Sequence, residues 1–372
     1  MPENLYVHFP FCRSKCRYCA LYSRVGVSSA DRDAYVRQLA DVIDTWGQTP
    51  DTWGQTPELG GQTPAQRLKT VYFGGGSPAL CDLRPVLAAL KPWRADETEF
   101  TVELHPLDVS DDVLRVLRDG GVNRISMGVQ SLDDATLAAM GRGYTADEAA
   151  QAFAHVKRFF DNVGIDLIIG YPDDPCEGWG RLSDWGLRHC SVYSLQNERG
   201  LANVPDDDWV LDRIRAVAEF FAKIGLERYE ISNYAVPGAE CRHNLAVWRG
   251  EDYVGLGAGA YGRIGRRRTR NFGVCPQPLA GSVSTTKGSV PTSNEGVCPQ
   301  AVEEMVTPAQ DALERRIFRL RTREGLDATG YPEWGQTLER YCRIGLLTRE
   351  NAIYRLTERG TEVCDAILAE LV

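Results

Sequence analysis

The segment Leu5-Tyr-Val-His-Phe-Pro-Phe-Cys-Arg-Ser-Lys-Cys-Arg-Tyr-Cys19 joins a strand-like run to three closely spaced cysteines. Three residues separate Cys12 from Cys16, and two separate Cys16 from Cys19. Three thiolates this close can bind three irons of a four-iron cluster and leave the fourth iron free for a small molecule. A structural zinc site is the alternative, but it normally needs four protein ligands in paired spacings, and no fourth Cys or His lies just downstream.

Short β-rich runs alternate with helical patterns through the first two thirds of the chain. The expected strands are Leu5 to His8, Thr70 to Phe73, Glu99 to Glu103, Arg124 to Gly128, Gly164 to Ile169 and Ser191 to Leu195. Amphipathic stretches between them are Asp31 to Ile43, Ser110 to Arg118, Asp133 to Ala139 and Ala146 to Phe159. This βαβ rhythm predicts an α/β fold with a partial (β/α)6 TIM-like barrel, whose working groups should follow the strands' C-terminal ends.

Length and composition predict one large domain plus a smaller one in a soluble globular protein. The chain has 372 residues, 43% of them apolar and 25% charged, with a net charge of -9. No transmembrane segment and no export signal are expected, and the 11 cysteines are interpreted as reduced thiols in a cytoplasmic setting. The negative charge disfavours general nucleic-acid binding.

The barrel is expected over residues 1–235 and a smaller C-terminal α/β domain over residues 236–372. Two repeat segments interrupt the pattern and are interpreted as inserted surface loops without an assigned function, at residues 46–64 and about 273–300. From Pro308 onward, expected helices at Ala312 to Leu320, at Leu338 to Arg343 and after Gly360 predict a winged-helix-like module. Its mixed charge favours packing on the barrel over contact with nucleic acid.

A glycine-rich turn follows the second strand as Gly74-Gly-Gly-Ser-Pro78. Missing side chains let backbone N–H and C=O groups approach a ligand closely, although a simple tight turn is the alternative. Glu103 ends the third strand, where its carboxylate could accept hydrogen bonds from ribose hydroxyls or form a surface salt bridge.

These motifs together resemble the HemN/HemW group of radical S-adenosylmethionine (SAM) proteins. The resemblance rests on the first 20 residues, the glycine turn and four further segments: Gly121 to Gln130, Ile165 to Gly170, Tyr229 to Asn233 and Glu240 to Asn244. It implies a [4Fe-4S] cluster whose open iron chelates the methionine part of SAM, and one-electron reduction that yields a 5'-deoxyadenosyl radical. A reductant protein of the flavodoxin or ferredoxin type is implied as a partner.

The resemblance also implies roles for residues that match the group's motifs. The cluster ligands would be Cys12, Cys16 and Cys19. The positions implied to contact SAM are Tyr6, Tyr18, Gly75, Gly76, Ser77, Glu103, Gln130, Arg142 and Asp166. Residue by residue the alternatives are structural: Asp166 as a hydrogen-bonding residue of an apolar strand, and Arg142 as a charge at a helix end.

Two branches of the group predict different functions. HemN-type oxygen-independent coproporphyrinogen III oxidases carry a further cysteine two positions after the third cluster cysteine, where this chain has Leu21. HemW-type proteins lack it and are regarded as heme chaperones that pass heme to hemoproteins. We therefore expect a chaperone in heme trafficking, with an acceptor hemoprotein as partner. A coproporphyrinogen dehydrogenase-like oxidoreductase, or another radical SAM enzyme of porphyrin metabolism, is the second hypothesis.

The HemW branch is also connected with heme through a His-Asn-x-x-Tyr-Trp motif. This chain has His243, Asn244 and Trp248, with Val247 in place of the tyrosine. His243 is the expected heme ligand and Trp248 a possible porphyrin platform, whereas a buried hydrogen-bonding role is the alternative for this histidine. The basic run Gly262 to Arg270 could meet heme propionates or form a solvated face.

Overall fold

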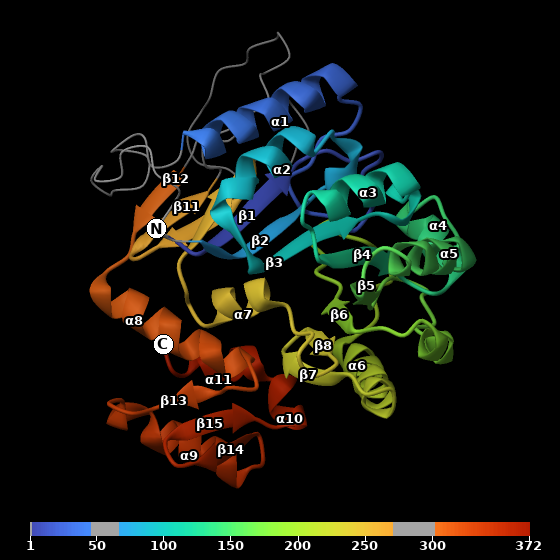
Figure 1. Cartoon of the computed structure of the whole chain (residues 1–372). Coiled ribbons are helices and arrows are strands. Elements are labelled where there is room, and N and C mark those ends of the chain that lie inside the picture. Colours follow the sequence, from blue (N-terminus) through green and yellow to red (C-terminus); the bar gives the residue numbers. More distant parts are fainter. Residues whose placement is uncertain (1, 46–66, 271–301) are drawn as a thin grey trace.

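Six parallel strands, β1 to β6, lie side by side in chain order at the centre of the computed structural model (Figure 1), which describes residues 2–45, 67–270 and 302–372. They belong to a sheet with the order β12-β11-β10-β9-β1-β2-β3-β4-β5-β6-β8-β7. Strand β9 also runs parallel to β1, on its other side. The structure is thus an incomplete α/β barrel, which confirms the predicted fold class.

The strands of this sheet are β1 (Asn4–Phe9), β2 (Leu68–Gly75), β3 (Arg94–Leu104), β4 (Arg124–Gln130), β5 (Asn162–Ile169), β6 (His189–Ser194), β7 (Glu227–Glu230), β8 (Asn233–Ala235), β9 (Tyr253–Leu256), β10 (Tyr261–Ile264), β11 (Arg267–Arg270) and β12 (Val302–Met305). A separate small sheet contains β13 (Leu326–Asp327), β14 (Leu347–Glu350) and β15 (Ile353–Leu356). The six strands predicted from sequence are confirmed as β1 to β6.

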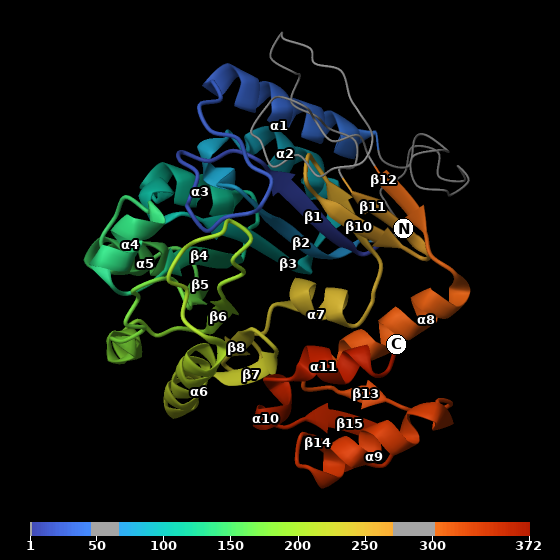
Figure 2. The same ribbon diagram turned by 180° about the vertical axis from the view of Figure 1, so that it is seen from behind.

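The helices are α1 (Ser29–Asp44), α2 (Arg84–Leu90), α3 (Asp111–Asp119), α4 (Asp134–Met140), α5 (Ala146–Lys157), α6 (Asp207–Lys223), α7 (Arg242–Trp248), α8 (Pro308–Ile317), α9 (Gly335–Arg343), α10 (Glu358–Thr361) and α11 (Cys364–Ala369). Helices α1 to α5 cover one face of the barrel strands, and α7 lies on the opposite face (Figures 1 and 2). No helix in the described part of the chain is both long and apolar enough to span a membrane.

Alternation along each central strand separates two chemically different faces. On β1, Leu5, Val7 and Phe9 are fully buried in the main hydrophobic core beside the helices. The alternate residues, including Tyr6 and His8, carry the polar groups of the opposite face. Ordinary barrels fill this interior with branched apolar side chains. A polar interior therefore provides hydrogen-bonding groups for a polar ligand.

Side-chain caps set the helix ends that the site depends on. Ser28 accepts a hydrogen bond from the Asp31 N–H at the start of α1, and Asp133 does the same for the Thr136 N–H at the start of α4. Such caps satisfy N–H groups that have no partner inside the helix. Helix α4 ends at Met140 and is capped by Gly141, whose φ of 80° favours glycine.

A second hydrophobic core lies near the C-terminus. It contains Ile317, Leu338 and Leu368 and packs the small sheet against helices α8, α9 and α11. This arrangement is consistent with the predicted winged-helix-like module. The expected boundary at residue 235 falls within the large sheet, because β9 to β12 continue that sheet beyond it. We therefore place the division between the two cores after β12. The predicted insertions lie outside the described residues.

Candidate functional site

The loop after β1 carries the three cysteines and is held by its own backbone. The Cys12 N–H donates to the Arg24 carbonyl at 2.9 Å, which closes the loop at its base. Lys15 Nζ donates to the Leu21 carbonyl at 2.6 Å and to Ser23 Oγ at 2.7 Å. Cys12, Cys16 and Cys19 are half-buried free thiols. The loop thus presents three thiols at the C-terminal end of the barrel strands.

The donor set of this loop fits a cluster in which each thiolate binds a different iron. Burial raises the pKa of Cys12, a hydrogen bond with Ser23 opposes this shift, and the neighbouring thiols of Cys19 and Cys16 reinforce it. The three sulfurs are therefore close enough to interact electrostatically. No three His, Cys, Asp or Glu side chains of the described residues converge as they would around a single metal ion.

The glycine turn lies directly beside this loop. The Gly76 N–H donates to the Phe9 carbonyl at 2.8 Å, and the Ser77 N–H donates to the Phe11 carbonyl at 2.7 Å. A Cβ on Gly76 would collide with both carbonyl oxygens, so only glycine permits this approach. Ser77 Oγ donates to Asp108, which also accepts from Arg13 at 2.6 Å. The turn is therefore locked to the cysteine loop.

Two carboxylates, Glu103 on β3 and Asp166 on β5, face the barrel interior from either side of β4. Glu103 accepts from Tyr72 Oη at 2.9 Å and from the Gly75 N–H at 3.1 Å. Burial, reinforced by the negative charge of Asp166, raises the pKa of Glu103 to about 7. Asp166 accepts from Ser126 Oγ at 3.1 Å, and burial raises its pKa as well. Glu103 can thus change its protonation state near neutral pH.

The remaining predicted positions line the same end of the barrel or its interior. Gln130 ends β4 with a φ of 74°, an uncommon conformation for a residue other than glycine. Arg142 donates to Cys16 Sγ at 3.3 Å and to Tyr18 Oη at 3.4 Å. Tyr6 lies deeper, with its Oη 3.1 Å from His8 Nδ1. The structure therefore brings these residues together around one polar interior.

Comparisons with known proteins agree with this geometry. A family model described as "Radical SAM superfamily" matches residues 6–182. The chain is 32% identical over 292 residues to "Heme chaperone HemW" of Lactococcus lactis subsp. lactis, covering 73% of this chain and 72% of that protein. This chain belongs to the HemW family. A HemW protein of Bacillus subtilis is 32% identical over 296 residues, with 73% of each chain covered.

Two further similarities extend over the whole chain. "Heme chaperone HemW" of Mycobacterium tuberculosis is 28% identical over 400 residues, covering 100% of this chain and 95% of that protein. The structure of coproporphyrinogen III oxidase (HemN) from Escherichia coli superposes with a TM-score of 0.76 at 20% identity, covering 100% of this chain and 90% of that chain. This superposition shows that the two chains share the fold.

His243, the expected heme ligand, lies inside the barrel at the start of α7. Its Nδ1 is 2.8 Å from Thr70 Oγ1, its backbone N–H donates to Glu99 at 3.0 Å, and its ring lies 5.3 Å from that of Tyr72. Burial lowers the pKa of His243 to about 3. In this structure the ring of His243 is buried and takes part in hydrogen bonding, and heme ligation by this residue stays a prediction.

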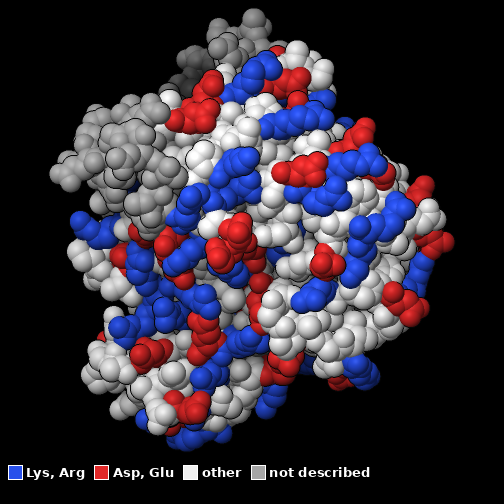
Figure 3. Space-filling view, in the orientation of Figure 1, with Lys and Arg blue, Asp and Glu red and all other residues white. Residues whose placement is uncertain are grey.

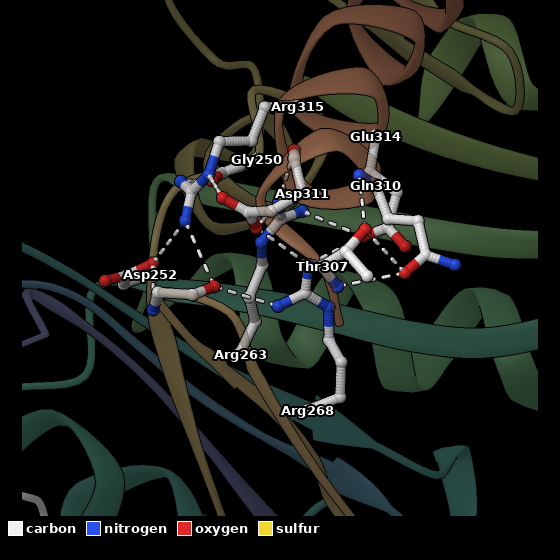
Figure 4. Close-up of polar contacts among 10 residues, drawn as sticks. Gly250, Asp252, Arg263, Arg268, Thr307, Gln310, Asp311, Glu314 and Arg315 are labelled. Carbon is white, nitrogen blue, oxygen red and sulfur yellow. Dashed lines mark hydrogen bonds and ion pairs between the residues drawn. The ribbon is translucent and has the colours of Figure 1, made fainter. Parts of the chain in front are cut away.

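The basic run also has a different setting from either one expected. Arg263, only 4% exposed, donates to Asp311 at 2.8 Å, and Arg268 donates to the same carboxylate at 2.9 Å. Arg268 also reaches Glu314 at 2.7 Å (Figure 4). Arg263 and Arg268 are therefore neither solvated nor free for propionates, because they bind α8, whereas Arg266 and Arg270 of the same run are exposed. Trp248 likewise packs against the C-terminal part, 6.2 Å from Phe318 between ring centroids.

Three residues of the site were missed by sequence reasoning. His8 faces the interior, with its Nε2 2.9 Å from the Tyr22 carbonyl, and the alternation of β1 could have identified it. Asp108 binds both the cysteine loop and Ser77, but nothing in its local sequence signals this. Tyr144 binds Arg142, and its place in Gly141-Arg-Gly-Tyr144 is a weak signal at most.

Proposed function

We propose that this chain holds a [4Fe-4S] cluster through Cys12, Cys16 and Cys19 and binds SAM beside it. When bound, the cluster supplies the electron for reductive cleavage of SAM. The backbone of Gly75 and Gly76, together with Ser77, would receive the methionine end. The close packing of Gly76 on the Phe9 and Phe11 carbonyls supports this assignment, because it holds the turn against the loop that would carry the cluster.

The other SAM contacts we propose are interior residues. Glu103 would accept hydrogen bonds from ribose hydroxyls, because its carboxylate faces the interior with only two partners among the described residues. Tyr6, Tyr18, Gln130 and Asp166 would complete the pocket around the nucleoside. Arg142, implied by the resemblance as a SAM contact, is considered separately below because its hydrogen bonds point to another role.

We further propose that the protein binds heme and passes it to an acceptor hemoprotein. The observation that carries this proposal is the similarity to proteins named "Heme chaperone HemW" at 32% identity over almost three quarters of this chain. Leu21, half-exposed in the cysteine loop, supports it, because no thiol stands where HemN-type oxidases have a further cysteine. A reductant protein and a cytoplasmic location remain part of the proposal.

The test is anaerobic reconstitution with iron and sulfide, followed by three assays on one preparation. These are heme titration by Soret absorbance, decarboxylation of coproporphyrinogen III, and release of 5'-deoxyadenosine. Heme binding without decarboxylation is the expected result. Decarboxylation would overturn the chaperone proposal in favour of the oxidase, and failure to bind heme would refute heme trafficking.

Two variants test the ligand assignment. Cys16→Ala should abolish the cluster's absorbance and lower the iron content, whereas Cys342→Ala, a half-buried free thiol on α9, should leave both unchanged. Full iron and sulfide in Cys16→Ala would contradict the assignment. For heme, His243→Ala should retain binding if the enclosed position persists in solution, and loss of the Soret shift in a folded variant would identify His243 as the ligand.

A further inference from the structure

Arg142 is held in place by the end of α4. The helix finishes at Met140, and the flanking Gly141 and Gly143 have φ values of 80° and 73°. The Arg142 N–H donates to the Leu137 carbonyl at 2.9 Å. Because both neighbours adopt conformations that favour glycine, the backbone turns sharply on either side of the arginine. This turn directs one long cationic side chain back across the barrel mouth.

The guanidinium is fully engaged with protein groups. Its Nε donates to Tyr144 Oη at 2.9 Å, and its Nη2 donates to the Gly128 carbonyl at 2.6 Å. Its Nη1 donates to Cys16 Sγ at 3.3 Å and to Tyr18 Oη at 3.4 Å. One residue therefore connects β4, the turn after α4 and the cysteine loop.

A backbone contact reinforces this connection. The Arg17 N–H donates to the Met140 carbonyl at 3.1 Å, so the chain segment next to Cys16 also caps the end of α4. The carbonyl ends of a helix favour such donors. Two independent contacts thus fix the position of Cys16 relative to α4, one from its neighbour's backbone and one to its own sulfur.

The positive charge of Arg142 favours negative charge on the Cys16 sulfur that it contacts. The residue is only 7% exposed, and among the described residues none of its hydrogen-bond acceptors is a carboxylate. A buried cation is costly unless an anion lies nearby. Among its side-chain acceptors, the Cys16 sulfur is the one that is negative once it binds iron, because burial raises the pKa of Tyr18 and Tyr144, and the charge of Asp166 also interacts with Arg142. Any further negative charge brought to the sulfur would be stabilised by the same guanidinium.

We propose that Arg142 is a positioning residue that fixes Cys16 and raises the reduction potential of the cluster. The proposal rests on the cluster assignment made above. Reduction adds one negative charge to the cluster, and a hydrogen bond from a buried cation to a ligand sulfur favours the reduced form. Net charge and hydrogen bonds to sulfur are established determinants of such potentials. Arg142 thereby makes the electron easier to accept.

The experiment is a redox titration of the reconstituted protein without SAM, followed by electron paramagnetic resonance. Arg142→Gln should give about tenfold less reduced cluster at a fixed applied potential, a shift of about 59 mV for one electron. Arg142→Lys keeps the charge and should shift it less. Arg115→Gln is the matched control, because it removes a cation of α3 whose partners are the carboxylates of Asp111 and Asp112 rather than a sulfur.

Each outcome bears on a different step. A cluster-loaded Arg142→Gln with the wild-type potential would overturn the tuning role while leaving the cluster assignment intact. Absence of a cluster from wild-type protein would instead overturn the proposed function. Should Arg142→Gln fail to fold, Tyr144→Phe removes the acceptor of Nε, together with the hydrogen bonds of Tyr144 Oη to the Gly128 and Val129 carbonyls, and should give a smaller downward shift. An unchanged potential in Tyr144→Phe would then refute the role, and weakened SAM binding alone would point to a direct SAM contact.

Discussion

The carboxylate of Asp311 on α8 binds arginines of the large sheet, and removing its charge should weaken the packing of α8 on that sheet. It accepts from Arg263 at 2.8 Å, from Arg268 at 2.9 Å and from Arg315 at 2.9 Å. The first two arginines belong to the β10–β11 hairpin of the large sheet, whereas Asp311 and Arg315 belong to α8 (Figure 4). Asp311→Asn keeps the size of the side chain but removes the charge that three guanidinium groups share.

The magnitude follows from the exposure of the partners. The side chain of Asp311 is 15% exposed, and those of Arg263, Arg268 and Arg315 are 5%, 20% and 33% exposed. Breaking a buried pair typically costs about 3–5 kcal/mol, and an exposed pair contributes about 0–1 kcal/mol. Because Glu314 still lies 2.7 Å from Arg268, some compensation remains. We therefore expect Asp311→Asn to lower the free energy of unfolding by about 3 kcal/mol.

The measurement is urea unfolding, combined with hydrogen exchange of the α8 amides to locate the loss. The control is Asp82→Asn, whose partner Arg84 lies 3.1 Å away with both side chains largely exposed, and which should change stability by less than about 0.5 kcal/mol. Positive and negative side chains are interspersed over the face seen in Figure 3, and the Asp82–Arg84 pair stands for such exposed pairs. Comparing Asp311→Asn with Asp82→Asn therefore separates the effect of the buried cluster from that of an exposed pair. A loss below about 1 kcal/mol for Asp311→Asn, or one equal to the control, would refute the reasoning.

Other predictions concern the site itself. Gly76→Ala should destabilise the fold by about 1–3 kcal/mol in urea, since its Cβ meets the Phe9 and Phe11 carbonyls, whereas Gly180→Ala enters open space. Glu103 keeps its proton until about pH 7 in the fold but ionises near 4.5 when unfolded. Its contribution to stability is therefore present below pH 4.5 and lost between pH 4.5 and 7, by at most about 3 kcal/mol, relative to Glu103→Gln. SAM affinity, measured by equilibrium dialysis, should rise from pH 6 to 8 in wild type only, because the ionised carboxylate accepts ribose hydroxyls better; a parallel rise in Glu103→Gln would contradict this.

Local patterns were sufficient for the barrel and for the cysteine loop. Strands β1 to β6 were predictable because each combines β-rich composition with neighbouring amphipathic helices. The cluster site was predictable as well, because Cys12, Cys16 and Cys19 lie within one segment of eight residues. The glycine turn was predictable as a close-approach site, since missing side chains mean the same thing in any fold that places the turn after a strand.

Long-range partners were beyond the reach of local pattern. His243 looks the same in sequence whether it faces a porphyrin or Thr70, and only the packing of α7 against β2 places it in the barrel. The same holds for Arg263, whose carboxylate partner lies 48 residues away. Charge and polarity are properties of a residue, but pairing and burial depend on which distant segment the fold brings beside it.

The sequence by itself determined that an α/β barrel carries three thiols and a glycine turn at the ends of its first two strands. Only the tertiary structure decided that the sheet continues through β9 to β12, that the arginines of β10 and β11 bind α8, and that Arg142 reaches Cys16 across 126 residues. The physical reason is that strand order and helix packing sum many weak contacts between distant segments, and no single segment encodes that sum.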